Sequence, residues 1–211
     1  VARIAATRED VELLAINDMA SMDMMVELLK NDAVHGTFKS EVEQIDENTI
    51  SIAGKKVKVF SDRDPKNLTL ADCGADKVLE CTGVFLTQAS AQVHLDNGIE
   101  KVLFSAPAKD KETPTFVMGV NEGFYDGQKI VSNASCTTNC LGPVAKVLDD
   151  AFGIEKGLMT TIHSYTNDQN ILDVKHSSDK RRARAGAINM IPTPTGAAKA
   201  ISLVMPQLLG K

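Results

Sequence analysis

Lys129 to Gly153, KIVSNASCTTNCLGPVAKVLDDAFG, leaves an apolar strand and enters a helix. The run 129–132 reads as a buried strand. From Thr138 to Phe152 the pattern is helical, and Gly153 stands where a helix-ending glycine is expected. A strand that leads directly into a helix predicts an α/β protein.

The residues before and after this stretch repeat the same alternation. Val11 to Asn17 is a short apolar run, Ser21 can cap a helix that continues through Lys30, and the run 49–60 alternates on both sides of Ala53-Gly54 like a hairpin. Further strands are expected at residues 77–81, 101–105, 115–120 and 157–165. The sequence therefore predicts an α/β fold with a largely parallel sheet.

Composition indicates an ordinary globular chain and excludes several classes of protein. Of 211 residues, 43% are hydrophobic and 24% charged, and the net charge is -5, so disorder, collagen and general attraction to nucleic acid are not expected. The four cysteines are too few and too unpatterned for a disulfide framework, and no run suggests a membrane span or a signal peptide. We expect free thiols and a cytoplasmic location.

Cys136 is the first candidate for chemistry. It falls near a helix N-terminus, where backbone N–H groups and the helix dipole favour a thiolate, and neighbouring hydroxyls could hold an oxyanion or a phosphate. The alternative is a buried structural thiol with capping residues beside it. Cys140 lies four residues on, but two cysteines at helical spacing without a second pair make a poor zinc site, so no metal is expected.

His163 is the candidate base. It lies near the end of the strand expected after the Cys136 helix, and a strand–helix–strand path could return its imidazole to the thiol. The alternative is a strand-end histidine with a structural role. His35, His94 and His176 lie in turn-like or helical segments, where we expect solvated or capping roles.

Two further segments suggest anion binding. Lys180 to Arg184 is a basic run in an acidic chain, and without interleaved aromatics it favours a solvated face or a local phosphate clamp over nucleic-acid binding. Thr193-Pro194-Thr195-Gly196 offers hydroxyls and a glycine that would let the backbone approach an anion, or it forms only a turn.

Asp18 ends the first expected strand, where a carboxylate can accept hydrogen bonds from a dinucleotide ribose. The same charge repels a 2′-phosphate, which favours NAD over NADP. The glycine-rich fingerprint that should precede it by about 20 residues is not in the chain, so an ordinary strand-end aspartate remains the alternative.

Taken together, these segments resemble the glyceraldehyde-3-phosphate dehydrogenase family, whose signature Ala-Ser-Cys-Thr-Thr-Asn-Cys stands at residues 134–140. The resemblance runs in order along essentially the whole chain. It also covers residues 16–18, 34–36, 63–65, 82–83, 105–108, 163–169, 181–184 and 195–199.

The resemblance implies a mechanism. Cys136 attacks the aldehyde of glyceraldehyde 3-phosphate, His163 takes the thiol proton, hydride passes to NAD, and inorganic phosphate cleaves the resulting thioester. The residues implied for the attacking phosphate are Ser135, Thr137, Thr195 and Gly196; those for the substrate's phosphate are Thr166 and Arg182. Those implied for NAD are Asp18, Arg63, Thr82 and Ser105.

The resemblance also implies the architecture. It predicts a Rossmann-type doubly wound parallel sheet lacking its first strand, in an NAD-binding domain of residues 1–135. Part of a mixed α/β catalytic domain follows at residues 136–211. Both domains are expected to be incomplete at the chain's ends, and the parent enzyme is expected to be a homotetramer.

Three alternatives stay open. A related dehydrogenase could act on erythrose 4-phosphate, a cysteine hydrolase could use Cys136 and His163 without a cofactor, and the chain could be a non-catalytic interaction fragment.

Overall fold

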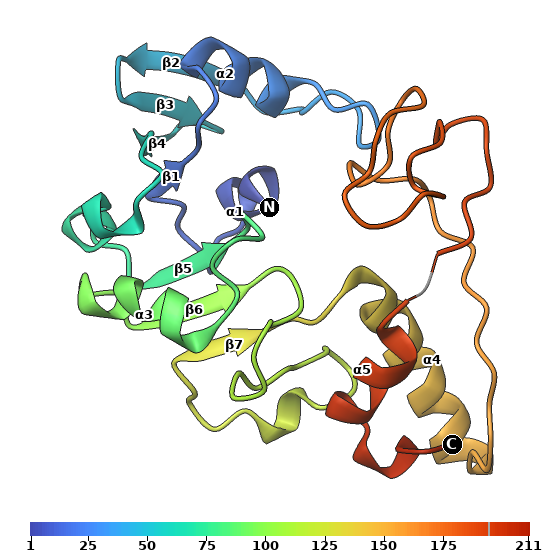
Figure 1. Cartoon of the computed structure of the whole chain (residues 1–211). Helices are drawn as coiled ribbons and strands as arrows, with labels where there is room; N and C mark the ends of the chain where they lie inside the picture. The colour runs from blue at the N-terminus through green and yellow to red at the C-terminus, as the bar shows by residue number, and fades with distance from the viewer. Residues whose placement is uncertain (194) are drawn as a thin grey trace. The chain divides into compact units, whose positions relative to one another are not determined.

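The computed structural model in Figure 1 describes residues 1–193 and 195–211. Pro194, from the Thr-rich segment 193–196, lies outside the described residues. The helices are α1 (Ala2–Thr7), α2 (Met22–Lys30), α3 (Gln88–Asp96), α4 (Cys136–Phe152) and α5 (Ala197–Val204). The strands are β1 (Ala15–Asn17), β2 (Val42–Asp46), β3 (Thr49–Ile52), β4 (Lys55–Phe60), β5 (Lys77–Glu80), β6 (Lys101–Phe104) and β7 (Ile130–Ser132).

The strands form two sheets. The first has the order β1-β4-β3-β2, with β1 and β4 parallel, and the second has the order β5-β6-β7, with β5 and β6 parallel. Placed end to end, they match the Rossmann order 3-2-1-4-5-6, with β4 and β1 as strands 3 and 2 and β5, β6 and β7 as strands 4 to 6. No strand among the described residues takes position 1, so the predicted sheet lacking its first strand is confirmed.

The hairpin predicted around Ala53-Gly54 is present. β3 and β4 are antiparallel, and Ile52 pairs with Lys55, which leaves a two-residue turn. Both turn residues have positive φ, 53° at Ala53 and 79° at Gly54, as a type I′ turn requires. This turn fixes the register that buries Ile50, Ile52 and Val57 on one face.

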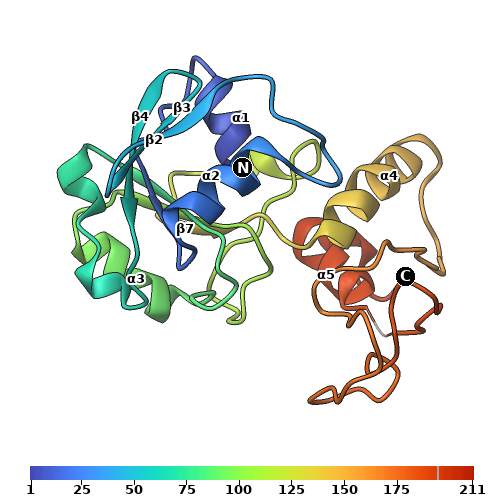
Figure 2. The same cartoon turned by 90° about the horizontal axis from the view of Figure 1, so that it is seen from above.

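The contacts divide the chain into two units. The first contains residues 1–104, 108–114 and 128–131, and the second contains residues 105–107, 115–127 and 132–211. The first has a core of apolar side chains from α1, α2 and the four-stranded sheet, and α2 lies beside β2 in Figure 2. Ser21 is the N-cap residue of α2, as predicted.

The second unit is built on α4 and α5, which pack against each other (Figure 1). Their shared core includes Ala145 on α4 and Ile201 and Val204 on α5. Gly142 permits a close approach, because a Cβ there would lie 3.2 Å from a methyl group of Val120. This packing holds α4, and therefore its N-terminus, in place.

Two predicted strands are not found. Residues 157–165 form an extended segment with no described strand beside them, and residues 115–120 make only a single bridge, from Thr115 to Ser132, before a turn. A strand needs a neighbour to satisfy its backbone groups, and Leu158 and Ile162 are fully exposed. Those two predictions from apolar runs were wrong for these residues.

None of the helices within residues 1–193 and 195–211 is long and apolar enough to cross a membrane.

Candidate active site

A sharp turn after β7 delivers the chain into α4. The buried Ser132 hydroxyl donates to the Ala106 carbonyl at 2.8 Å and accepts from the Ala134 N–H at 3.1 Å. Ala134 is buried with φ of 58°, a left-handed conformation that costs an alanine about 1–2 kcal/mol. The turn therefore places the next two residues at the helix start through a locally strained backbone.

Ser135 caps α4, and Cys136 is its first residue. The Ser135 Oγ accepts from the Thr138 N–H at 3.0 Å and also lies 2.8 Å from the Thr138 hydroxyl. Cys136 is exposed at the N-terminus of a 17-residue helix. The aligned N–H groups there favour an anion, so a thiolate is stabilised at this position.

His163 lies against this thiol. Its Nε2 is 3.3 Å from the Cys136 Sγ, and its Nδ1 is 2.6 Å from the Ser164 carbonyl oxygen. A carbonyl can only accept, so in the neutral imidazole Nδ1 carries the proton and donates it to Ser164. The lone pair of Nε2 then faces Sγ, which is the tautomer that a base for the thiol needs.

The two side chains shift each other's ionisation. The hydrogen bond from His163 lowers the pKa of the Cys136 thiol below its ordinary value, and a weaker contribution comes from Thr137. The hydrogen bonds to Cys136 and to the Ser164 carbonyl raise the pKa of His163. These opposite shifts favour a thiolate–imidazolium pair over a neutral thiol and imidazole.

The hydroxyls expected around the attacking phosphate lie at two helix starts. Thr137 is beside Cys136 on α4, with its Oγ1 4.0 Å from Sγ, and the Ser135 hydroxyl serves the cap. Gly196 is the N-cap of α5, and the Thr195 hydroxyl accepts from the Ala197 N–H at 3.2 Å.

The residues expected at the substrate's phosphate lie in the irregular segment 166–184. Thr166 is exposed, and its N–H donates to the Gln169 side chain. The Arg182 Nη1 lies 2.5 Å from an Asp168 carboxylate oxygen, and its Nε is buried without a hydrogen-bond partner in the described part of the chain. The same Nε lies 3.8 Å from an Asp179 carboxylate oxygen, so two carboxylates hold the guanidinium.

The residues expected to contact NAD all follow parallel strands. Asp18 comes directly after β1 and Thr82 two residues after β5; Arg63 follows β4, and Ser105 comes directly after β6. All four are exposed. A carboxylate, a guanidinium and hydroxyls at the carboxyl ends of parallel strands suit the polar groups of a dinucleotide, so the residues fit this cofactor.

The structure brings Cys136 and His163 into direct contact. It also shows that Thr82 is bonded to Glu80, a residue that the sequence analysis did not identify. Thr82 donates from both its N–H and its hydroxyl to Glu80. Beside Glu80 lies His94, which is only 3% exposed, so its predicted solvated or capping role was wrong. Burial on a helix is predicted from the spacing of apolar residues, and a buried histidine on the inner face of α3 does not contribute to that pattern.

Two partners of site residues were also missed. The Ser164 carbonyl orients His163, and Asp168 holds Arg182. A backbone carbonyl cannot be recognised from the sequence. The Asp168 carboxylate lies in the same segment as Thr166, and its charge could have indicated a partner for Arg182.

Two models of one family match the chain. Residues 1–88 match "Glyceraldehyde 3-phosphate dehydrogenase, NAD binding domain", and residues 135–211 match "Glyceraldehyde 3-phosphate dehydrogenase, C-terminal domain".

Curated relatives agree with these matches. The chain is 53% identical to glyceraldehyde-3-phosphate dehydrogenase 1 of Bacillus cereus, over 100% of the chain and 63% of that protein. It is 55% identical to the chloroplastic glyceraldehyde-3-phosphate dehydrogenase GAPB of Arabidopsis thaliana, over 95% of the chain and 45% of that protein. With the Streptomyces coelicolor glyceraldehyde-3-phosphate dehydrogenase, the identity is 53% over 96% of the chain and 60% of the relative. The chain thus spans about half to two thirds of the length of these proteins.

Proposed function

Because the chain belongs to the glyceraldehyde-3-phosphate dehydrogenase family, we propose that its parent protein is the glycolytic oxidoreductase that converts glyceraldehyde 3-phosphate, phosphate and NAD to 1,3-bisphosphoglycerate and NADH. The observation that carries this proposal is the 3.3 Å contact between the Cys136 Sγ and the His163 Nε2 at the start of α4.

The first step is nucleophilic addition by Cys136. His163 takes the thiol proton through Nε2, and the thiolate sulfur forms a bond to the aldehyde carbon, whose oxygen becomes the alkoxide of a thiohemiacetal. N–H groups at the start of α4 and the Thr137 hydroxyl can stabilise that negative charge. Loss of hydride from the same carbon leaves a thioester on Cys136.

NAD, when bound, supplies the hydride acceptor for this oxidation. Inorganic phosphate next attacks the thioester carbonyl: a carbon–oxygen bond forms, the carbon–sulfur bond breaks, and the acyl phosphate leaves while Cys136 returns to the thiolate. We assign Ser135, Thr137, Thr195 and Gly196 to the attacking phosphate. We assign Thr166 and Arg182 to the substrate's own phosphate, and the guanidinium of Arg182, whose planar fork matches phosphate geometry, supports that role.

For the cofactor we assign Asp18 to the adenosine ribose, Arg63 and Thr82 to its neighbourhood, and Ser105 to the nicotinamide side. We place the NAD-binding domain at residues 1–135 and the catalytic domain from residue 136. The position of all four residues after parallel strands supports the cofactor assignment.

We propose a cytoplasmic homotetramer. The four free cysteines support a reducing compartment, and the chloroplastic relatives represent the alternative location. Residues 158–190 carry exposed apolar side chains such as Leu158, Ile162 and Met190, and these support a subunit contact at this segment in the proposed tetramer. Light scattering on the full-length protein tests the tetramer.

Cys136→Ser in the full-length protein tests the mechanism. Turnover should fall by roughly 10⁴-fold or more, because a serine hydroxyl has no comparable thiolate character, while NAD binding stays largely intact. NADH formation and calorimetric titration measure the two effects, and Cys140→Ser is the matched control. Turnover in Cys136→Ser at the wild-type rate would contradict the proposed mechanism. Parallel assays with glyceraldehyde 3-phosphate and erythrose 4-phosphate decide between the two substrates.

A further inference from the structure

The last residue of β5 carries a buried carboxylate. Glu80 is 4% exposed, and its two oxygens face different partners. Oε1 accepts from the Thr82 N–H at 2.7 Å and from the Thr82 hydroxyl, whereas Oε2 lies 3.7 Å from the His94 Nε2. One oxygen therefore faces the turn that follows β5, and the other faces the inner side of α3.

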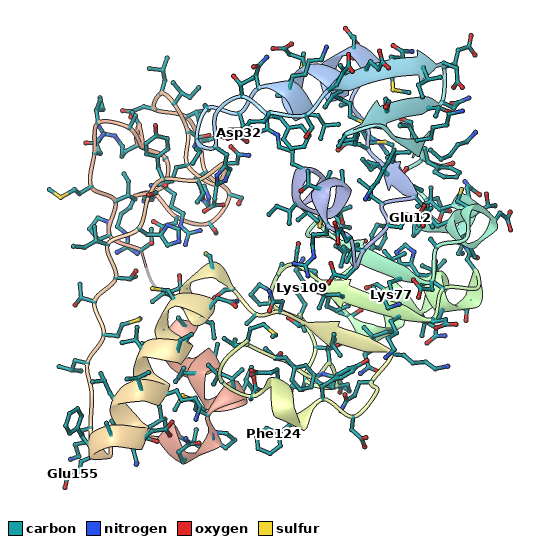
Figure 3. All side chains as sticks on the ribbon, turned by 180° about the vertical axis from the view of Figure 1, so that it is seen from behind. Glu12, Asp32, Lys77, Lys109, Phe124 and Glu155 are labelled. Carbon is teal, nitrogen blue, oxygen red and sulfur yellow. The ribbon has the colours of Figure 1, made fainter. Side chains whose placement is uncertain are left out.

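The turn is held by a chain of contacts that begins at this carboxylate. The Thr82 Oγ1, which donates to Glu80, accepts from the Val84 N–H at 3.1 Å. From outside, the Lys109 Nζ donates to the Gly83 carbonyl at 3.1 Å; Lys109 is labelled in Figure 3. Gly83 has φ of +76°, a conformation that suits glycine. The path of residues 81–84 thus depends on Glu80.

His94 is buried beside this carboxylate with an unsatisfied ring nitrogen. The residue is 3% exposed, and its Nε2 has no hydrogen-bond partner in residues 1–193 and 195–211. Glu80 is the acidic group within ion-pair distance of it. Burial disfavours the charge of Glu80, but the contacts with His94 and Thr82 lower the pKa of this carboxyl overall, so it is ionised near neutral pH.

A buried carboxylate beside a buried histidine is a costly way to shape a surface turn. Desolvating a carboxylate and an imidazole costs several kcal/mol, and apolar residues of similar size would often stabilise a fold as well. A carboxylate that accepts two bonds from one residue gives the turn a shape that a neutral cap holds less firmly. We therefore expect the main effect of Glu80 and His94 to be on the conformation of the turn, and less on the stability of the domain.

From these contacts we propose that Glu80 and His94 are positioning residues for the cofactor: they fix the turn 81–84 at the carboxyl end of β5, and so set the affinity for NAD. This inference rests on the proposed NAD-dependent function. The Thr82 hydroxyl is already engaged with Glu80 and Val84, so the turn contributes the path of its backbone.

The test uses the full-length protein with NAD as the probe. His94→Leu removes the imidazole beside Glu80, and His94→Gln keeps a side-chain donor there. Thr82→Val removes the hydroxyl's bonds to Glu80 and Val84 but keeps the backbone N–H bond to Glu80. Val102→Ala, in the buried core of β6 beside β5, is the matched control for general loss of stability. Hydrogen exchange of the Thr82 and Val84 amides reports the turn directly, and calorimetry reports the dissociation constant of NAD.

We expect His94→Leu and Thr82→Val to speed exchange of these amides and to weaken NAD binding, each by about tenfold. In His94→Leu, the turnover number at saturating NAD should change by less than about twofold. His94→Gln should restore both properties to near the wild-type values. If His94→Leu does not fold, Thr82→Val and His94→Gln still decide the matter.

Unchanged amide exchange, or faster exchange with unchanged NAD affinity, overturns the inference and leaves the proposed function standing. Equal effects in Val102→Ala overturn it as well, because general destabilisation then explains them. If the wild-type protein does not bind NAD, the proposed function itself fails, while amide exchange still reports whether the pair orders the turn.

Discussion

Two turns that follow strands of the same three-stranded sheet are built in opposite ways. After β5, a buried carboxylate, Glu80, accepts from Thr82 and lies beside a buried histidine. After β7, a buried neutral hydroxyl, Ser132, donates to the Ala106 carbonyl and accepts from the Ala134 N–H, and Cys136 lies exposed four residues after Ser132.

The difference follows from the charge that each turn has to tolerate. A carboxylate beside Cys136 would raise the pKa of the thiol by repulsion and oppose the thiolate. The second turn therefore uses hydroxyls, a helix start and an imidazole, all of which favour negative charge on sulfur. The first turn contains no thiolate that has to be stabilised, so a carboxylate, Glu80, can hold its backbone in place.

Replacing His163 by Asn removes the imidazole from the second turn and has the largest expected effect. Turnover of the full-length protein should fall by about 10²–10⁴-fold, the range for a general base. Because His163 lowers the pKa of Cys136, the rate of alkylation by iodoacetamide should fall near neutral pH and recover as pH rises toward the ordinary thiol pKa.

His35→Asn, at an exposed position, is the control and should leave both rates unchanged. An alkylation profile in His163→Asn that overlays the wild type would remove His163 from the site.

Glu80→Gln neutralises the first turn's carboxylate, and its effect should depend on pH. At pH 7 the free energy of unfolding should fall by about 2–3 kcal/mol, because a buried charged acceptor is lost beside His94. The folded-state pKa of Glu80 is lowered, so the carboxylate stabilises the fold above the unfolded-state pKa, and this contribution is lost as pH falls through the folded value. The difference between wild type and variant should therefore shrink below about pH 4.

Urea unfolding from pH 7 to pH 3 measures this difference. Glu43→Gln on β2 makes the same chemical change at an exposed position and should have a much smaller effect. A Glu80→Gln deficit that stays constant across this range would show that ionisation of Glu80 does not stabilise the fold.

The two turns also differ in what the sequence could predict. Apolar runs located β5 and β7, and the helical pattern that ends at Gly153 located α4, because these features are local. The position of Cys136 at a helix start followed from the same reasoning. The burial of His94 depends on residues distant in sequence, and no local pattern predicts it. The missing strand at 157–165 fails for the same reason, since strand formation needs a neighbour.

Ser132→Ala tests the neutral link in the second turn. The free energy of unfolding should fall by about 1–2 kcal/mol, because the Ala134 N–H and the Ala106 carbonyl each lose their bond to a fully buried hydroxyl. Ser202→Ala on α5 removes a more exposed hydroxyl and should cost less than about 0.5 kcal/mol. Equal losses in the two variants would show that the Ser132 link adds nothing specific.

Ala134→Gly should have the smallest effect, because two terms oppose each other. Glycine adopts φ of 58° without the strain of about 1–2 kcal/mol that alanine bears there. It also loses about 0.5–1 kcal/mol more conformational entropy on folding. The free energy of unfolding should therefore rise by between about 0 and 1.5 kcal/mol. Valine, which is β-branched, tolerates a positive φ less well than alanine, so Ala134→Val should destabilise the fold. Urea unfolding of both variants measures the signs, and a valine variant as stable as the wild type would contradict a strained turn before Cys136.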